Sequence, residues 1–199
     1  LNLQKRPTNL KSLQVASSIG QIELINSYKE IFQKYGLRVG QVLMSKNVLE
    51  DRSQFVNTTA ALNELINQEI VPVINENDIV ATEELKFGDN DRLSAIVAII
   101  TKADKLIIVT DQEGLFNTDP TSSSEAKKID FIEFDSEELI DLIEKSTSGT
   151  GMGGFSTKIM AAQMAARAVE GPTVAPAKLV LDRQRGRPAG SVHAERGAG

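Results

Sequence analysis

The sequence predicts one α/β domain, in which a mainly parallel β-sheet carries helices on both faces. Three observations support this prediction. The chain has 199 residues, of which 41% are hydrophobic, so it can bury one substantial core but hardly two. Segments with the apolar spacing of helices alternate with short apolar segments rich in β-branched residues. This alternation is typical of parallel sheets, because two parallel strands need a crossover connection that is usually a helix.

The predicted helices and strands follow one another along most of the chain. The first helical segment, one long helix or two, should end at Gly36. The next helical segment has Asn57 and Thr58 as candidate N-caps, because short polar side chains bond the free N–H groups at a helix start. The predicted helices are residues 10–36, 55–68, 92–103, 136–145 and 156–169, and the predicted strands are residues 37–44, 70–74 and 105–110.

Composition and charge exclude several classes of function. Lys and Arg total 22 against 27 Asp and Glu, a net charge of −5, which is not the basic balance of a protein that binds nucleic acid or an anionic membrane. The chain has no cysteine and one histidine, His193, which rules out disulfides, thiolate nucleophiles and Cys/His zinc sites. No apolar run of membrane-spanning length and no signal-peptide core occur. We therefore expect a cytoplasmic protein that binds small molecules.

Two clusters of carboxylate and amide side chains mark a candidate ligand site. Residues 75–78 (NEND) directly follow the predicted strand 70–74, and residues 89–91 (DND) directly precede the predicted helix 92–103. Ligands of parallel sheets bind beyond the carboxyl ends of the strands, where Thr110 and Asp111 also fall. Helix capping is the simpler explanation of residues 89–91, but a cap needs one side chain and three are present.

The chemistry of these clusters suits a free amino acid. Carboxylates attract an ammonium group, and amide N–H groups donate to carboxylates. A metal site is the competing interpretation, because Asp89 and Asp91 could also hold a hard cation through oxygen. The two interpretations are compatible if the second substrate is a magnesium nucleotide.

A glycine-rich segment, residues 148–162 (SGTGMGGFSTKIMAA), predicts a phosphate site. It follows a helix rather than a strand, which argues against a dinucleotide fingerprint, and it lacks a Walker A motif. Its main-chain N–H groups can approach phosphate oxygens, and Lys158 falls in the first turn of the next helix. The alternative is that Lys158 is a solvated lysine at a helix start.

Three segments together resemble the glutamate 5-kinase branch of the amino acid kinase family. They are residues 71–95 (VPVINENDIVATEELKFGDNDRLSA), residues 105–120 (KLIIVTDQEGLFNTDP) and residues 151–158 (GMGGFSTK), and the resemblance runs from about residue 3 to about residue 168. It implies a three-layer α/β/α sandwich with a mainly parallel sheet. It also implies transfer of the γ-phosphoryl group of ATP, with Mg²⁺, to the side-chain carboxylate of L-glutamate, the first step of proline biosynthesis.

The same resemblance implies roles for individual residues. Asp78 and Asn90 would contact glutamate, with Asn75, Asp89 and Asp91 lining the same pocket, while Lys158 and Asp91 would be catalytic. Mg²⁺ would be held mainly through the ATP phosphates, without a protein metal site. The residues implied to bind ATP are Thr110, Asp111, Met152, Gly153, Gly154, Phe155, Ser156, Thr157 and Lys158. Met152 and Phe155 depart from the threonine and methionine of many relatives, although both leave the main chain of the loop available for phosphate.

The two ends of the chain depart from the family pattern. We expect a partial kinase domain at residues 1–169, without the family's first strand, its Lys-Gly-Ser segment and its Ser-Gly loop, and an atypical tail at residues 170–199, disordered or out of frame. Two alternatives stay open: another amino acid kinase, similar to acetylglutamate or aspartate kinases, and an inactive nucleotide-binding fragment. A homo-oligomer and a transient complex with glutamate 5-semialdehyde dehydrogenase are further expectations, because an exposed acyl phosphate reacts with water.

Overall fold

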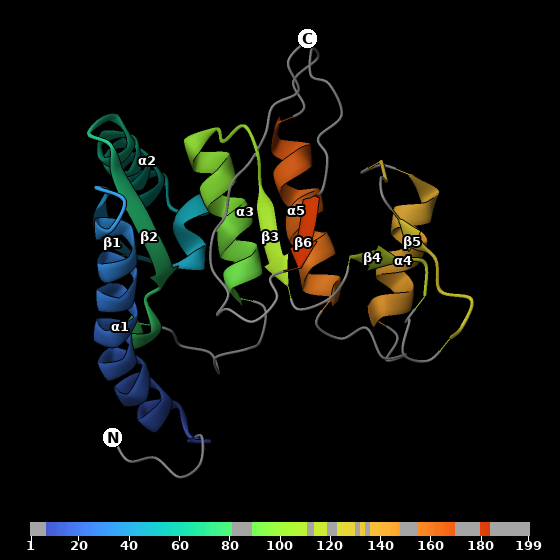
Figure 1. Ribbon diagram of the computed structural model, residues 1–199, viewed down its shortest axis with the longest axis horizontal. Helices are drawn as coiled ribbons and strands as arrows, with labels where there is room; N and C mark the ends of the chain where they lie inside the picture. Colours follow the sequence, from blue (N-terminus) through green and yellow to red (C-terminus); the bar gives the residue numbers. More distant parts are fainter. Residues whose placement is uncertain are drawn as a thin grey trace. The chain divides into compact units, whose positions relative to one another are not determined.

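The computed structural model describes residues 7–80, 89–110, 114–118, 123–129, 132–133, 136–147, 155–169 and 180–183. The chain divides into two compact units, unit 1 at Leu1–Asn90 and unit 2 at Asp91–Gly199. Figure 1 gives the labels of the helices and strands.

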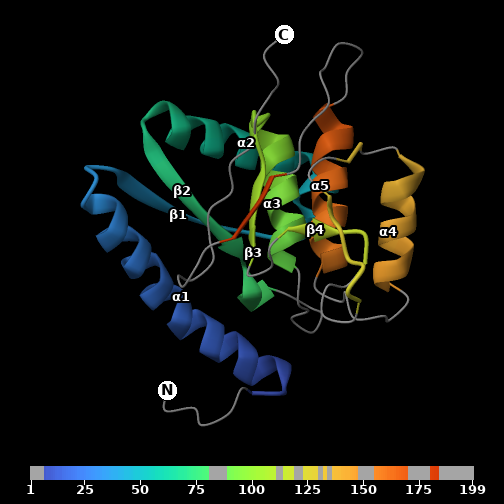
Figure 2. The ribbon, with the colours of Figure 1, turned by 45° about the vertical axis from the view of Figure 1, so that its right-hand side comes forward.

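Unit 1 contains a pair of parallel strands with a helix on each side. Its elements are α1 (Leu10–Gln33), β1 (Arg38–Met44), the 3₁₀ helix η1 (Lys46–Leu49), α2 (Arg52–Asn67), β2 (Ile70–Glu76) and the 3₁₀ helix η2 (Asp78–Val80). The register of the pair runs from Arg38 opposite Ile70 to Met44 opposite Glu76. Helix α1 contacts β1 and η2, whereas α2 contacts β2 and η1, and Figure 2 shows the two helices on opposite sides of the strand pair.

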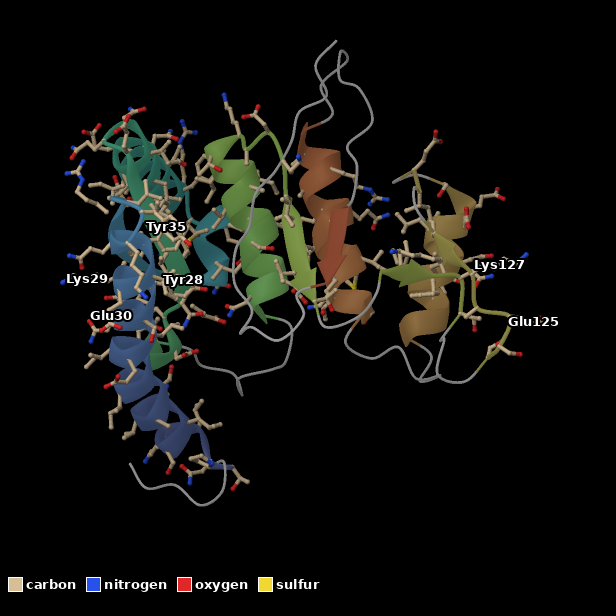
Figure 3. All side chains as sticks on the ribbon, in the orientation of Figure 1. Tyr28, Lys29, Glu30, Tyr35, Glu125 and Lys127 are labelled. Atoms are coloured by element: carbon tan, nitrogen blue, oxygen red, sulfur yellow. The ribbon has the colours of Figure 1, made fainter. Side chains whose placement is uncertain are left out.

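One long helix, α1, forms the first predicted helical segment. Its N-cap is Asn9, whose side-chain oxygen accepts a hydrogen bond from the Ser12 amide at 2.9 Å. Gly36, with φ of +71°, follows its end in the left-handed conformation that glycine adopts most easily. Burial raises the pKa of Tyr28, which is labelled in Figure 3 and whose ring centroid lies 6.2 Å from that of Phe32.

The N-cap predicted for α2 is wrong. Asp51 caps this helix, because its Oδ1 accepts hydrogen bonds from the amides of Ser53 at 2.8 Å and Gln54 at 2.9 Å. Asn57 and Thr58 lie inside the helix, which begins at Arg52. The carboxylate of Asp51 satisfies the free amides six residues, nearly two turns, before Asn57, so the helix starts there.

Replacing Asp51 by alanine is therefore expected to lower the free energy of unfolding by about 0.5 to 2 kcal/mol, the usual cost of losing an N-cap side chain. Asp51→Asn keeps an acceptor oxygen at the same position and should stay within about 0.5 kcal/mol of the unaltered chain. Urea denaturation followed by circular dichroism measures both changes. Equal stability of the two variants would show that the cap contributes nothing.

Unit 2 contains short strand pairs and three helices in its described part. Its elements are α3 (Asp89–Thr101, which begins two residues before the unit boundary), β3 (Ile107–Thr110), β4 (Leu115–Phe116), β5 (Lys128–Ile129), α4 (Glu137–Thr147), α5 (Phe155–Val169) and β6 (Val180–Arg183). Strands β3 and β6 are parallel, with Ile107 opposite Val180, and β4 and β5 are antiparallel.

The core of unit 2 combines small and large aliphatic residues. Each large side chain that is fully buried contributes about 1.5 to 3 kcal/mol relative to exposure to water. Alanine predominates on α3 and α5, and it leaves room for close packing. The buried core residues are Ala95, Ala98, Ile108, Leu115, Ile132, Leu139, Leu142, Ile159, Ala161, Ala162, Ala165 and Ala166.

These elements confirm the predicted α/β class and its parallel strand pairing. The described sheets are small, with two strands each, so the three-layer sandwich stays a prediction. Within the tail predicted to be atypical, β6 is the described segment, and the other residues of 170–199 lie outside the described part of the chain. Among the described helices, none has the length and apolar character that crossing a lipid bilayer requires.

Candidate functional site

A charged cluster lies where the first turns of α3 and α5 meet in unit 2. The Nζ of Lys158 donates hydrogen bonds to both carboxylate oxygens of Asp91, each at 3.1 Å. The Oγ1 of Thr157 donates to Oδ2 of Asp91 at 2.7 Å. Two consecutive residues of α5 therefore hold one carboxylate of α3, and we call Asp91, Thr157 and Lys158 the aspartate–lysine cluster.

The helix dipoles explain why Asp91 and Lys158 are paired. A carboxylate is stabilised at the N-terminus of a helix, whereas a lysine there is destabilised by a few tenths of a kcal/mol or more. Asp91 supplies the anion that offsets the cost of Lys158. The two side chains are 14% and 22% exposed, so solvent screens their attraction less than that of a surface pair. Lys158 is therefore not a freely solvated lysine, and the Asp91 carboxylate bonds to α5 side chains rather than only capping α3.

The carboxyl end of β3 lies at the same end of unit 2 as this cluster. Figure 1 shows that β3 and β6 end where α3 and α5 begin. Thr110, the last residue of β3, is buried, and so is Ser156 in the first turn of α5. Helix N-termini present unsatisfied main-chain N–H groups and partial positive charge. These N–H groups and the ammonium of Lys158 make this end of unit 2 suited to bind an anion such as a phosphate.

Several residues predicted to bind ATP lie outside the described part of the chain. Asp111, Met152, Gly153 and Gly154 lie outside the described residues, and for Phe155 the structure describes only its position as the first residue of α5.

Two predicted glutamate-binding residues, Asn75 and Asp78, contact α1 within unit 1. The Oγ of Ser17 donates a hydrogen bond to the Asp78 carboxylate. The Nδ2 of Asn75 donates to Oε1 of Gln21 at 2.8 Å. The Nε2 of Gln14 donates to the main-chain oxygen of Asp78 at 3.3 Å and to that of Ile79 at 3.2 Å. Asn75 is the second-last residue of β2 and pairs with Leu43, so it lies within the strand and does not follow it. Asp78 is the first residue of η2.

Sequence reasoning missed the three α1 residues, Gln14, Ser17 and Gln21. A signal was present, because residues spaced by three and four lie on one face of a helix. Recognising it would have required knowing which face of α1 meets the end of β2. We call these three residues the polar face of α1.

Asp89 and Asn90 are the first two residues of α3 and do not precede it as expected. The Asn90 side chain is exposed, and that of Asp89 lies outside the described part. Among the described residues, no group of three or more His, Cys, Asp or Glu side chains is arranged to hold a metal ion. The two oxygens of Asp91 together accept three hydrogen bonds from α5, which occupy most of the lone-pair sites of this carboxylate.

Comparisons with known proteins show which family the chain belongs to. Glutamate 5-kinase of Proteus mirabilis is 45% identical over 168 residues, which are 84% of this chain and 46% of that protein. The glutamate 5-kinases of Salmonella paratyphi B and Salmonella newport are each 44% identical over 168 residues, with the same two coverages. The chain thus spans about half the length of the curated relatives it matches. The model of the amino acid kinase family matches residues 1–174, and the chain therefore belongs to that family.

Proposed function

We propose that this protein transfers the γ-phosphoryl group of ATP to the side-chain carboxylate of L-glutamate. The products are ADP and glutamyl 5-phosphate, and the reaction is the first step of proline biosynthesis. Membership of the amino acid kinase family and the identity to glutamate 5-kinases support the reaction class. One structural observation carries the proposal, the aspartate–lysine cluster at two helix N-termini. Its lysine and N–H groups suit a phosphoryl group whose negative charge shifts during transfer.

The reaction fits the side chains that the chain provides. One P–O bond forms to an oxygen of the glutamate carboxylate while the bond from the γ-phosphorus to the ADP oxygen breaks. The attacking carboxylate is already ionised at neutral pH, so no general base is needed. Catalysis then requires positioning and neutralisation of negative charge. The lack of cysteine and the single histidine are therefore no obstacle.

In this proposal the nucleotide phosphates contact Lys158 and the main chain that precedes α5. Lys158 stabilises the charge that develops toward the ADP oxygen, and Asp91 and Thr157 fix its position. Mg²⁺, held mainly through the ATP phosphates, supplies further charge neutralisation. Thr110 and Asp111 contribute to nucleotide binding, as the resemblance to the family implies.

Glutamate, in the same proposal, is bound by residues of the two polar clusters. The Asp78 carboxylate attracts the α-ammonium, and the amides of Asn75 and Asn90 bond the substrate carboxylates. Ser17 holds the Asp78 carboxylate in place through its hydrogen bond.

Several finer features belong to the proposal by resemblance to the family. They are the three-layer α/β/α sandwich, a cytoplasmic location, homo-oligomer formation and transient hand-over of the acyl phosphate to glutamate 5-semialdehyde dehydrogenase. The hand-over has a chemical reason, because an acyl phosphate in water hydrolyses or cyclises.

Trapping of the product with hydroxylamine tests the proposed activity in the full-length gene product that contains these residues. Hydroxylamine converts an acyl phosphate into a stable hydroxamate, which is measured by its colour with Fe³⁺. L-glutamate should give product with magnesium ATP, while N-acetylglutamate and L-aspartate should give little. Preference for either of the last two would assign the chain to another amino acid kinase, and ATP binding without any hydroxamate would identify an inactive nucleotide-binding protein.

A further inference from the structure

The half-buried positions of α1 form a seam along the strand pair. From residue 18 to the end of the helix, the half-buried residues are Gln21, Ile25, Tyr28 and Phe32, spaced by four, three and four. Gln14 and Ser17 continue the same spacing toward the start of the helix. A helix that packs on a sheet is expected to carry apolar residues along such a seam. Along this line of positions the second half of α1 carries Ile25, Tyr28 and Phe32, whereas the first half carries Gln14, Ser17 and Gln21. The half-buried apolar residues Leu10, Leu13 and Ala16 lie beside that polar part.

The polar half of the seam faces the end of β2 and the start of η2. Ser17 bonds the Asp78 carboxylate, Gln14 bonds main-chain oxygens there, and Gln21 accepts from Asn75. Half-buried polar groups are costly unless they find hydrogen-bond partners, so their grouping at this one place needs a reason.

Gln21 has a donor that these contacts leave unused. Its Nε2 is buried and has no hydrogen-bond partner in the described part of the chain. In the orientation of the two amides that the structure has, Oε1 of Gln21 accepts from Asn75, so Nε2 is the group left over. A buried amide donor without a partner costs about 1 to 3 kcal/mol, which a ligand acceptor would recover.

We propose that Gln21 is a substrate-binding residue whose side-chain amino group donates a hydrogen bond to the α-carboxylate of the amino acid. This inference rests on the proposed function. Gln21 lies four residues, about 6 Å along the helix axis, from Ser17, which holds Asp78. An α-ammonium bound by Asp78 has its α-carboxylate on the same carbon atom, within a few ångströms, while the reacting carboxylate lies further along the side chain. The polar face of α1 therefore recognises the part of the substrate that does not react.

The variant Gln21→Glu isolates the donor. The new carboxylate has the same shape and still accepts from Asn75, but it has no N–H group to donate and repels a substrate carboxylate. We expect the KM for glutamate to rise about tenfold or more, with kcat and the KM for ATP within about threefold of the unaltered enzyme. Gln21→Met, which is neutral and also lacks the donor, should raise the KM for glutamate in the same direction. Gln33→Glu, at an exposed position of the same helix, should change neither constant.

A second substrate distinguishes binding from a structural role. The α-carboxamide of glutamate keeps the reacting carboxylate, and its amide group can donate to the carboxylate of Gln21→Glu. The preference for glutamate over this analogue, as a ratio of kcat/KM values, should therefore fall about tenfold or more in Gln21→Glu. A purely structural role would weaken both substrates equally and leave this ratio unchanged.

The outcomes separate this inference from the proposed function. If the unaltered enzyme phosphorylates glutamate while Gln21→Glu and Gln21→Met keep its KM and its substrate preference, the role of Gln21 is overturned and the proposed function stands. If the unaltered enzyme forms no glutamyl phosphate, both are overturned. Thermal melting of each variant without ligand shows that the measured protein is folded.

Discussion

Lys158→Ala is expected to lower turnover about a hundredfold or more while ATP still binds measurably, which corresponds to a rise of at least about 2.7 kcal/mol in the activation free energy. The ammonium of Lys158 lies in the first turn of α5 and is held by both oxygens of Asp91. As the γ-phosphoryl group leaves, negative charge builds up on the ADP oxygen, so the attraction to Lys158 is stronger in the transition state than in the ground state. An interaction of that kind changes kcat more than binding.

The design must separate the loss of Lys158 from the exposure of its partner. Among the residues that the structure describes, removing the ammonium leaves Thr157 as the side chain that bonds the Asp91 carboxylate, and an uncompensated charge would repel phosphate by itself. The double variant Lys158→Ala with Asp91→Asn removes both charges. If Lys158 acts on the phosphoryl group, the double variant stays as slow as Lys158→Ala. Recovery of turnover in the double variant would instead place the effect in the unpaired Asp91.

The control for a general effect of positive charge is Lys29→Ala. Lys29 is an exposed lysine of α1, labelled in Figure 3, and its removal should leave kcat unchanged. Turnover is measured by hydroxamate formation and ATP binding by calorimetry with a non-hydrolysable analogue. Full activity of Lys158→Ala would remove this residue from the mechanism.

Hydrophobic periodicity predicted the kind and order of the helices and the main strands, but not all of their first and last residues. The strand predicted at residues 70–74 continues through Glu76, and the helix predicted at residues 92–103 begins at Asp89. In both places polar residues extend an element beyond its apolar pattern. A strand continues as long as it has a partner to pair with, and β1 provides one up to Met44 opposite Glu76. That partner is distant in the sequence, so local patterns do not reveal it.

The types of residue in each segment indicated which residues belong to the candidate site, but not which of them bond one another. The clusters around Asp78 and Asp91 and the glycine-rich segment were visible as unusual groups of polar or small residues. The pairing of Asp91 with Lys158 was not, because 67 residues separate them and each has a simpler local explanation. The polar face of α1 was hidden for a similar reason, since glutamine and serine are ordinary on an exposed helix and become informative only where the helix is half buried.

Asp78→Ala is expected to weaken glutamate binding about ten- to a hundredfold and to leave ATP binding nearly unchanged. Asp78 contacts the polar face of α1 through the hydrogen bond that its carboxylate accepts from Ser17. Losing a hydrogen bond between an ammonium and a carboxylate costs about 1.5 to 3 kcal/mol, which corresponds to this range of affinity. Calorimetric titration with glutamate and, separately, with a non-hydrolysable ATP analogue measures the two affinities.

Two further variants distinguish the charge of Asp78 from its place in the packing. Asp78→Asn keeps the shape and an acceptor for Ser17 but removes the charge, so it should lose most of the affinity that Asp78→Ala loses. Ser17→Ala removes the hydrogen bond and keeps the carboxylate, and it should weaken glutamate binding by no more than about tenfold, the worth of one neutral hydrogen bond. Glu30→Gln, at an exposed position of α1 labelled in Figure 3, is the control for loss of a distant negative charge.

The relative sizes of these losses of affinity distinguish a substrate-binding role of Asp78 from a structural one. If the carboxylate attracts the substrate ammonium, affinity falls in Asp78→Ala and Asp78→Asn alike and much less in Ser17→Ala. If Asp78 only anchors α1 to η2, Ser17→Ala should be as damaging as Asp78→Ala, and Asp78→Asn should be mild because it still accepts from Ser17. Unchanged glutamate affinity in Asp78→Asn would therefore show that this carboxylate does not bind the substrate, whatever its contribution to the fold.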